Sequence, residues 1–214
     1  CSISTRTLSK SSFDCSNVGS NTIYLIVTDA NGNIDSASAV ITVQDVIKPT
    51  VITQNITVSL DASGSGSITA TQVDNGSTDN CTISTRTLSK SSFDCSNVGA
   101  NTVYLIVTDV NGNVDSASAV ITVQDVIKPT VVSTPSDIAL GYCDAAYTYV
   151  LPTGDDNCGI TVTQIAGLPP GSNFPVGETV NTFEISDPSG NSVTTSFIVD
   201  IRVRYMPFTN LDLS

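Results

Sequence analysis

The chain contains no histidine, and it lacks the short motifs that mark common catalytic sites. Histidine is the side chain best suited to accept a proton near neutral pH, so its absence removes the usual catalytic base. There is no Gly-x-Ser-x-Gly elbow and no phosphate-binding loop, and the only glutamates are Glu178 and Glu184. The aspartates fall in turn-forming segments with no evident apolar pocket to raise a pKa. We therefore expect no enzymatic activity.

Basic residues and long apolar runs are also scarce. Eight lysines and arginines accompany 20 aspartates and glutamates, which gives a net charge of −12. The basic residues form no stripe, which argues against nucleic-acid binding. No apolar run approaches the roughly 18 residues of a membrane span, and no signal peptide is recognisable. An apolar content of 40% is ordinary for a globular protein.

Six cysteines fall into three pairs of near neighbours. These pairs are Cys1/Cys15, Cys81/Cys95 and Cys143/Cys158. Without a CxxC motif or a histidine, they fit zinc poorly and predict disulfides formed in an oxidising compartment. Each neighbouring pair would close a loop of about 15 residues, a stabilisation of about 3 kcal/mol in the chain-entropy model.

Repetition is the strongest feature of the sequence. Residues 1–51 return at 81–131 with five conservative substitutions, a period of 80 residues. A catalytic pocket needs one special constellation, whereas near-identical tandem copies suit a protein built for length. The substitutions are Ser2/Thr82, Ser20/Ala100, Ile23/Val103, Ala30/Val110 and Ile34/Val114.

The period predicts the domain organisation. Residues 1–46 form the C-terminal part of a truncated module, 47–126 a complete module, 127–204 a divergent module, and 205–214 a tail or linker. One interpretation is a window on a longer array. The alternative is an incomplete first module that a strand of another chain completes.

Short alternating runs rich in Val, Ile and Thr predict strands, and no segment has a sustained helical period. Turn-forming residues separate the runs, with Asn111-Gly112 as the clearest hairpin signal. The prediction is an all-β fold of tandem immunoglobulin-like β-sandwich modules, arranged as beads in a rod by short, proline-containing linkers. The predicted strands of the central module are Val51–Ile52, Ile56–Leu60, Ser67–Val73, Thr82–Leu88, Thr102–Thr108 and Ser118–Gln124.

The divergent module indicates which way side chains point. Phe183 stands at the position of Leu105, and Phe197 at that of Ala119, so these positions are predicted to face the core. Glu184 and Asp200 replace apolar or neutral residues and are predicted to face outward. On this register the repeated copy exposes Tyr104 and Ile106, either under a neighbouring strand or as a lateral contact between filament subunits.

The spacing of these motifs resembles a known family. The run Asp79-Asn80-Cys81, then Gly99-x-Asn101-Thr102-Val103, then Thr108-Asp109-x-Asn111-Gly112-Asn113 is similar to a hyalin repeat (HYR) domain. The whole module resembles tandem repeats of large secreted surface and gliding-motility adhesins of Bacteroidota. The resemblance implies an immunoglobulin-like sandwich, secretion and a role in adhesion or cell-surface filaments. One departure is that Cys143 precedes the Asp-Asn-Cys site, whereas Cys95 follows it.

The same resemblance implies a modification. The sequences Asp35-Ser36-Ala37 and Asp115-Ser116-Ala117 match the short O-glycosylation motif of that phylum, which makes Ser36 and Ser116 candidate glycosylation sites. The alternative is that both serines simply belong to a hairpin edge.

Acidic loops that gather at one end of an immunoglobulin-like sandwich predict a cation site. Calcium takes six to eight oxygen ligands from carboxylates, amides and carbonyls. We expect Ca²⁺ at the module junctions, and the alternative is that Asp and Asn serve turn geometry alone. The candidate ligands are Asp45, Asp74, Asp79, Asp109 and Asn111 at one junction, and Asp125, Asp155, Asp156 and Asp187 at the next.

The sequence therefore predicts a structural stalk or filament segment of a secreted bacterial surface adhesin, with no organic cofactor and no membrane insertion. Its partners are neighbouring repeats, with lateral self-association or strand complementation as further contacts. The alternative is a carbohydrate- or protein-binding module in the divergent repeat. The segment Gly167–Phe174 is then the most distinctive loop, although it equally fits a plain strand connection.

Overall fold

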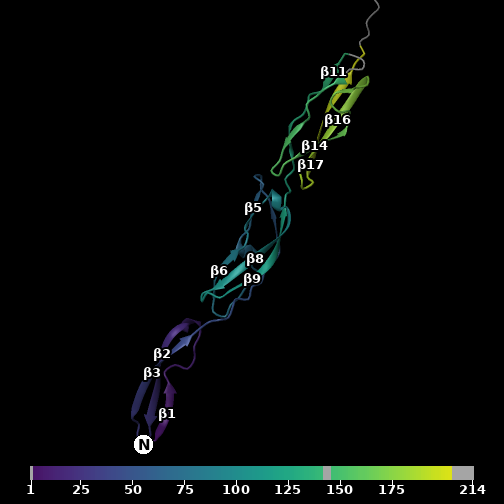
Figure 1. Cartoon of the computed structure of the whole chain (residues 1–214). Helices are drawn as coiled ribbons and strands as arrows, with labels where there is room; N and C mark the ends of the chain where they lie inside the picture. Colours follow the sequence, from purple (N-terminus) through teal and green to yellow (C-terminus); the bar gives the residue numbers. More distant parts are fainter. Residues whose placement is uncertain (1, 142–145, 204–214) are drawn as a thin grey trace, which may run out of the picture. The chain divides into compact units, whose positions relative to one another are not determined.

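The computed structural model describes residues 2–141 and 146–203, and its fold is all-β (Figure 1). Contacts divide the chain into two compact units. Unit 1 comprises Cys1–Ile56, Ile68–Ser91 and Thr102–Val120. Unit 2 comprises Thr57–Ser67, Ser92–Asn101 and Ile121–Ser214. Among the described residues, no helix is long and apolar enough to cross a membrane.

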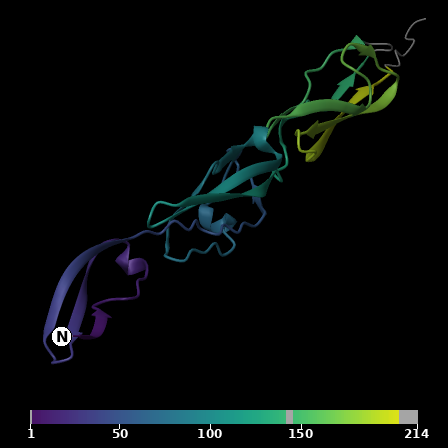
Figure 2. The same cartoon turned by 60° about the horizontal axis from the view of Figure 1, so that its bottom comes forward.

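The first copy of the repeat is a three-stranded antiparallel sheet in unit 1, in the order β1-β2-β3. Its strands are β1 (Ile3–Leu8), β2 (Gly19–Asp29) and β3 (Ile34–Val43). The β2–β3 hairpin pairs without interruption from Gly19 opposite Val43 to Thr28 opposite Ile34, and it forms the long purple ribbon pair of Figure 2.

The second copy, together with the residues before it, forms a four-stranded sheet in the order β4-β9-β8-β6 and a two-stranded sheet of β5 and β7. Along β8 the alternation expected of a half-buried strand is clear, since Leu105 is fully buried and Tyr104 is 50% exposed. The strands are β4 (Ile56–Ser59), β5 (Ser65–Ser67), β6 (Ile83–Leu88), β7 (Ser92–Asp94), β8 (Gly99–Asp109) and β9 (Val114–Gln124).

Two of the predicted strands need correction. The strand predicted over Ser67–Val73 is wrong beyond its first residue, because β5 ends at Ser67 and Ala70–Val73 forms the short helix α1. The Thr69 N–H donates to Gln72 Oε1 at 2.8 Å, the backbone half of a capping box. At Val51–Ile52 the structure has only isolated bridges at the two flanking threonines.

The divergent repeat lies in unit 2 and contains a four-stranded sheet in the order β11-β17-β16-β14. Its core residues include Phe183 and Phe197, which confirms both predicted inward positions. Tyr149 packs edge-on against Phe197, with ring centroids 4.8 Å apart. The strands are β10 (Thr130–Ser133), β11 (Ile138–Leu140), β12 (Ala146–Tyr147), β13 (Thr153–Asp155), β14 (Thr161–Ala166), β15 (Ser172–Asn173), β16 (Gly177–Ser186) and β17 (Ser192–Ile201).

Candidate metal centres and adjacent disulfides

Two groups of three aspartates bring carboxylate oxygens to within 4.8 Å of one another. The first centre consists of Asp45, Asp79 and Asp109, all in unit 1. The second centre consists of Asp125, Asp156 and Asp187, all in unit 2. Each group takes its aspartates from three kinds of place. Asp45 and Asp125 follow a long strand, Asp79 and Asp156 precede a cysteine by two residues, and Asp109 and Asp187 lie where the first strand of a hairpin ends.

The hairpin turn fixes one carboxylate of the first centre. Asp109 Oδ1 accepts the backbone N–H groups of Asn111 and Asn113, both at 2.8 Å, and Oδ2 accepts the Asn113 amide at 2.7 Å. Burial raises the pKa of Asp109, but the hydrogen bonds from Asn113 and the turn outweigh it and hold this pKa below its usual value. The turn therefore holds Asp109 as a charged carboxylate.

The Asp-Asn-Cys run supplies the second carboxylate of this centre. Asp79 Oδ2 accepts the backbone N–H groups of Cys81 at 2.8 Å and Thr82 at 3.2 Å. Its other oxygen, Oδ1, is buried and has no hydrogen-bond partner among the described residues. One oxygen is thus spent on orienting the side chain, and the other is left for a ligand.

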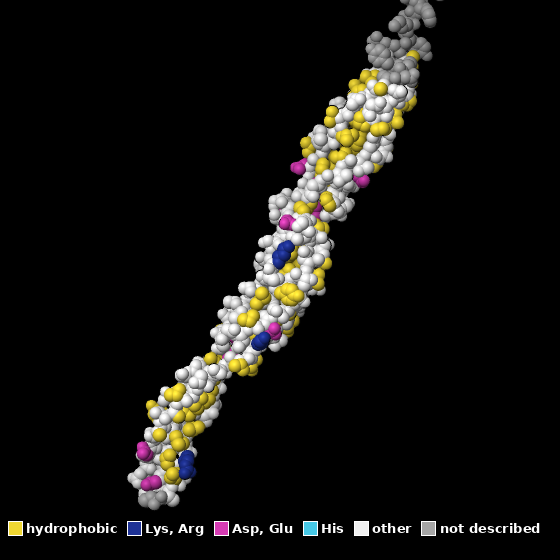
Figure 3. Space-filling model, in the orientation of Figure 1, with side chains coloured by type: hydrophobic (Ala, Val, Ile, Leu, Met, Phe, Trp, Pro, Cys, Tyr) yellow, Lys and Arg dark blue, Asp and Glu magenta, His cyan; other side chains and the backbone are white. Residues whose placement is uncertain are grey.

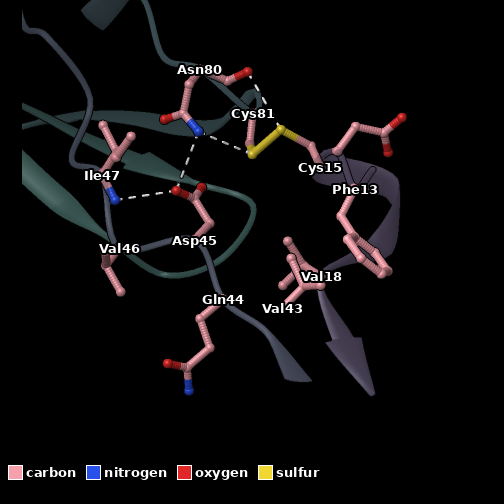
Figure 4. Close-up of a pocket in the computed structure, with 11 residues that line it drawn as sticks. Phe13, Cys15, Val18, Val43, Gln44, Asp45, Val46, Ile47, Asn80 and Cys81 are labelled. Carbon is pink, nitrogen blue, oxygen red and sulfur yellow. Dashed lines mark hydrogen bonds between the residues drawn. A yellow bond between two sulfur atoms is a disulfide. The ribbon is translucent and has the colours of Figure 1, made fainter. Parts of the chain in front are cut away.

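Asp45 completes the first centre from the segment after β3. Its Oδ1 accepts the backbone N–H of Ile47 at 3.1 Å and the side-chain amide of Asn80 at 3.3 Å, as Figure 4 shows. Its Oδ2 accepts the side-chain amide of Asn111 at 2.8 Å. Both oxygens of Asp45 therefore have protein donors.

The second centre is less well satisfied. Asp125 is only 6% exposed, and its Oδ1 accepts the N–H of Ile127 at 3.1 Å and the amide of Asn157 at 3.2 Å. Its Oδ2 has no partner within residues 2–141 and 146–203. Asp156 Oδ1 and Asn157 Oδ1 are likewise buried without a partner in that part of the chain. Three buried oxygens in this centre can thus still accept a cation or a hydrogen bond.

The charge balance of both centres favours a hard cation. Two carboxylates about 4.8 Å apart repel by about 3 kcal/mol at an effective dielectric of about 20. Within the described residues, the ion pairs are Arg86–Asp74 and Arg202–Asp200, and neither involves these six aspartates. An all-oxygen set of carboxylates and amides matches Ca²⁺ chemistry and offers no soft ligand for a transition metal.

The disulfides beside the centres differ from the predicted pairing. Cys15 bonds Cys81, 66 residues away, and Cys95 bonds Cys158, 63 residues away. The predicted pairs Cys1/Cys15, Cys81/Cys95 and Cys143/Cys158 are therefore wrong for these four cysteines, whereas Cys1 and Cys143 themselves lie outside the described residues. The six-residue strand β6, which spans about 20 Å, lies between Cys81 and Cys95 along the chain, so closeness in sequence does not by itself bring their sulfur atoms together.

Each disulfide is in contact with its neighbouring centre through an asparagine. The Asn80 amide that donates to Asp45 also lies 3.2 Å from Cys81 Sγ, and Cys15 Sγ lies 3.4 Å from the Asn80 carbonyl oxygen (Figure 4). In unit 2, Cys95 Sγ lies 3.4 Å from the Asn157 carbonyl oxygen. The Asp-Asn-Cys run therefore joins a carboxylate, an amide and a covalent cross-link within three residues.

Two of the predicted ligands lie outside both centres. Asp74 forms an ion pair with Arg86 at 2.8 Å and accepts hydrogen bonds from the N–H and hydroxyl of Ser77. Asp155 is exposed in β13, where its carbonyl oxygen accepts the hydroxyl of Thr130 at 3.2 Å. Asn111 contacts the first centre as a hydrogen-bond donor to Asp45. The sequence did not single out Asn80 and Asn157. Their position between a candidate aspartate ligand and a disulfide cysteine was the signal that could have identified them.

The other predicted sites lie on exposed strands. Ser36 in β3 and Ser116 in β9 are both exposed. Tyr104 is exposed and Ile106 is half-buried on the outer face of β8. Figure 3 shows hydrophobic side chains along the strands with only isolated basic groups on the visible face. Glycosylation and lateral contact at these positions stay predictions.

The distinctive loop of the divergent repeat is tied into its own core. The Leu168 N–H donates to Asn181 Oδ1 at 2.9 Å, and the Tyr149 hydroxyl donates to the Leu168 carbonyl at 2.6 Å. Phe174, at the end of the loop, is buried. A Cβ at Gly167 would lie 2.3 Å from Asn181 Oδ1, so this glycine permits the close approach. These contacts favour the strand-connection interpretation of Gly167–Phe174.

Residues 124–201 match the HYR domain family. Two curated relatives agree with this match. Hyalin of Lytechinus variegatus is 29% identical over 194 residues, which are 84% of this chain and 36% of that protein. Hyalin of Strongylocentrotus purpuratus is 29% identical over 201 residues, 88% of this chain and 17% of that protein. These findings support an HYR-type, immunoglobulin-like repeat, and the chain spans about a third or less of either relative.

Solved structures give a more distant likeness. Sidekick-1 immunoglobulin domains 1-4 align with a TM-score of 0.43 at 12% identity, over 89% of this chain and 60% of that chain. Protocadherin Gamma C5 EC1-3 aligns with a TM-score of 0.41 at 15% identity, over 87% and 78% of the two chains. Similarity at this level adds nothing to the strand order described above.

Proposed function

We propose that this chain is a non-enzymatic stalk segment of a secreted cell-surface adhesion protein, in which a disulfide and a divalent cation fasten each repeat to the next. The observation that carries the proposal is the Cys15–Cys81 disulfide, because it joins one copy of the repeat to the start of a near-identical copy. The HYR match and the two hyalin relatives support an adhesion setting.

The disulfides suit a protein that carries tension. A pulling force on the two ends of the chain cannot extend the residues between Cys15 and Cys81, nor those between Cys95 and Cys158, while the bonds stay intact. Disulfides persist in oxidising surroundings, which supports secretion. The bacterial setting implied by the Bacteroidota resemblance is part of the proposal, whereas the relatives named above come from two animals.

The cation acts at the same places as the disulfides. The carboxylates of the two centres would hold Ca²⁺, which would cancel their mutual repulsion and fix segments that are distant in sequence. The covalent bond limits how far the segments separate, and the cation would limit how they move within that range. The two fastenings would therefore stiffen the chain together.

Single-molecule extension of the full chain tests the mechanical part. Reduction should lengthen the fully extended chain by about 220 Å for Cys15–Cys81 and about 210 Å for Cys95–Cys158, at about 3.4 Å per released residue. The double variant Cys15→Ser/Cys81→Ser should show only the second increment under oxidising conditions. Equal extended lengths before and after reduction would rule out the mechanical role.

Thermal unfolding tests the cation. Calcium chloride should raise the melting temperature of the full chain, and EDTA should reverse the effect, since a ligand at 100 times its Kd stabilises the folded state by about 2.7 kcal/mol. Asp125→Asn should abolish the response of the second centre, and Asp155→Asn serves as the control because Asp155 lies outside it. A melting temperature that ignores both calcium and EDTA would contradict the cation role alone.

A further inference from the structure

The two centres share a backbone frame but differ at one turn position. The turn of the first centre is Asp109-Val-Asn111-Gly-Asn113, and that of the second is Asp187-Pro-Ser189-Gly-Asn191. In both, the last asparagine bonds the aspartate of its own turn at 2.7 Å and the carbonyl oxygen of the linker aspartate at 3.2–3.3 Å. Comparison of the two turns therefore shows the effect of the middle residue, which is Asn111 in the first and Ser189 in the second.

That middle residue determines whether the linker aspartate is satisfied. The amide of Asn111 donates to Asp45 Oδ2 at 2.8 Å. The exposed Ser189 gives no such bond to Asp125, whose Oδ2 has no partner among the described residues. Asp125 is also 6% exposed, so water cannot readily solvate this oxygen, whereas Asp45 is only half-buried. The more deeply buried carboxylate is thus the one that has an oxygen without a donor.

Asn157 and Asp156 each add one more buried oxygen that has no hydrogen-bond donor among the described residues. Asn157 directs its Nδ2 toward the Asp61 carbonyl at 3.1 Å and Asp125 Oδ1 at 3.2 Å, which leaves its Oδ1 free to act as a ligand. Asp156 Oδ1 is the third unsatisfied oxygen. In the first centre, Asp79 Oδ1 is the one buried side-chain oxygen without a partner among the described residues.

We propose that the second centre, with Asp125, Asp156, Asp187 and the Asn157 oxygen, is the high-affinity site for a hard divalent cation of the Ca²⁺ class, and that the residue at position 111 or 189 sets this difference. Buried carboxylate oxygens without donors are stabilised by a cation more than oxygens that already accept a hydrogen bond. A cation entering the first centre must displace the Asn111 amide from Asp45. This inference rests on the proposed cation role and adds which centre is filled first.

Exchanging Asn111 and Ser189 in the full chain tests the inference. Calcium binding is measured by isothermal titration calorimetry with calcium chloride. The wild-type chain should bind one Ca²⁺ at least about tenfold more tightly than any second one. Ser189→Asn should weaken the tight site by at least about tenfold, the equivalent of one lost charged hydrogen bond. Asn111→Ser should strengthen the weaker site by a similar factor. Ser189→Ala is the matched control and should leave the tight site unchanged.

The outcomes separate the two proposals. If the wild-type chain binds no Ca²⁺, the cation role fails and the inference fails with it. If it binds two ions with equal affinity, or if Asn111→Ser weakens binding because Asn111 is itself a ligand, the cation role stands and the inference is overturned. Asp125→Asn assigns the tight site, because that site must disappear in this variant if it is the second centre.

Discussion

Leu25 and Leu105 occupy the same position in two near-identical copies of the repeat, yet Leu25 is 41% exposed and Leu105 is fully buried. The two local sequences differ by a single neighbour two residues earlier, Ile23 against Val103. Residues 47–80, which precede the second copy, provide β4 beside β9. Local sequence alone therefore does not fix the burial of this leucine.

This pair predicts unequal costs for one substitution. Leu105→Ala should lower the free energy of unfolding by about 2 to 5 kcal/mol, the usual loss for a buried leucine. Leu25→Ala should cost less than about 1 kcal/mol, because part of that side chain already contacts solvent. Urea unfolding of both variants measures the difference, and equal losses would show that the two copies are equally covered in solution.

The ion pair between Asp74 and Arg86 predicts a loss of stability in acid. Burial raises the pKa of Asp74, but hydrogen bonds from Ser77 and the Arg86 charge outweigh it, so the folded pKa lies below its ordinary value of 3.8. A group with a lowered folded pKa contributes its full stability above the unfolded pKa and loses it as the pH falls through the folded value. Unfolding measured from pH 6 to pH 2 should show this loss below about pH 4.

Asp74→Asn should remove that part of the acid dependence and cost about 1 kcal/mol at neutral pH, a modest figure because Arg86 is partly exposed. Asp115→Asn, on an exposed strand position, is the control and should change neither quantity. An unaltered acid profile in Asp74→Asn would assign the loss to other carboxylates.

The cross-repeat pairing predicts a simple pattern in an unreduced tryptic digest. Lys48 and Lys128 each precede proline and resist cleavage, so Cys15 and Cys81 share the peptide 11–86, while Cys95 and Cys158 share 91–202. Mass spectrometry should find these two peptides unlinked to each other. A single species containing both would contradict this pairing, because a Cys81–Cys95 bond, for example, would link the two peptides.

Gly64 predicts how tightly the second disulfide is packed. Its φ is +72°, and a Cβ there would lie 2.8 Å from the Asn157 carbonyl oxygen and 2.9 Å from Cys95 Sγ. Gly76 has a similarly positive φ of +90° but open space around it. Gly64→Ala should therefore destabilise the chain more than Gly76→Ala, because it adds a steric clash to the same backbone strain. Melting temperatures of the two variants measure the difference, and equal losses would contradict close packing.

Strand alternation and the divergent repeat made much of the fold predictable. Phe183 and Phe197 identified core positions because large aromatic side chains are mostly buried, and in an alternating strand they mark the face that packs on the core. The helix at Ala70–Val73 was missed because the β-branched residues around it favour strands, although the Thr69 and Gln72 spacing is a capping-box signal.

The candidate site was less predictable, because its partners are distant in sequence. Spacing alone favoured bonds between neighbouring cysteines, whereas the folded chain separates Cys81 from Cys95 by a strand. The aspartate clusters were predicted as groups, but sequence could not tell that Arg86 neutralises Asp74. Neither could it tell that the Asn111 amide reaches Asp45, since each depends on side-chain direction in three dimensions.

The Cys15–Cys81 bond also bears on how such a gene can change. The second copy contributes its earlier cysteine, Cys81, to a bond with the first copy and its later cysteine, Cys95, to a bond with the divergent copy. An in-frame gain or loss of one 80-residue unit therefore places an equivalent pair of cysteines at the new boundary. Recombination can therefore alter copy number and still leave a cysteine partner on each side of the new boundary.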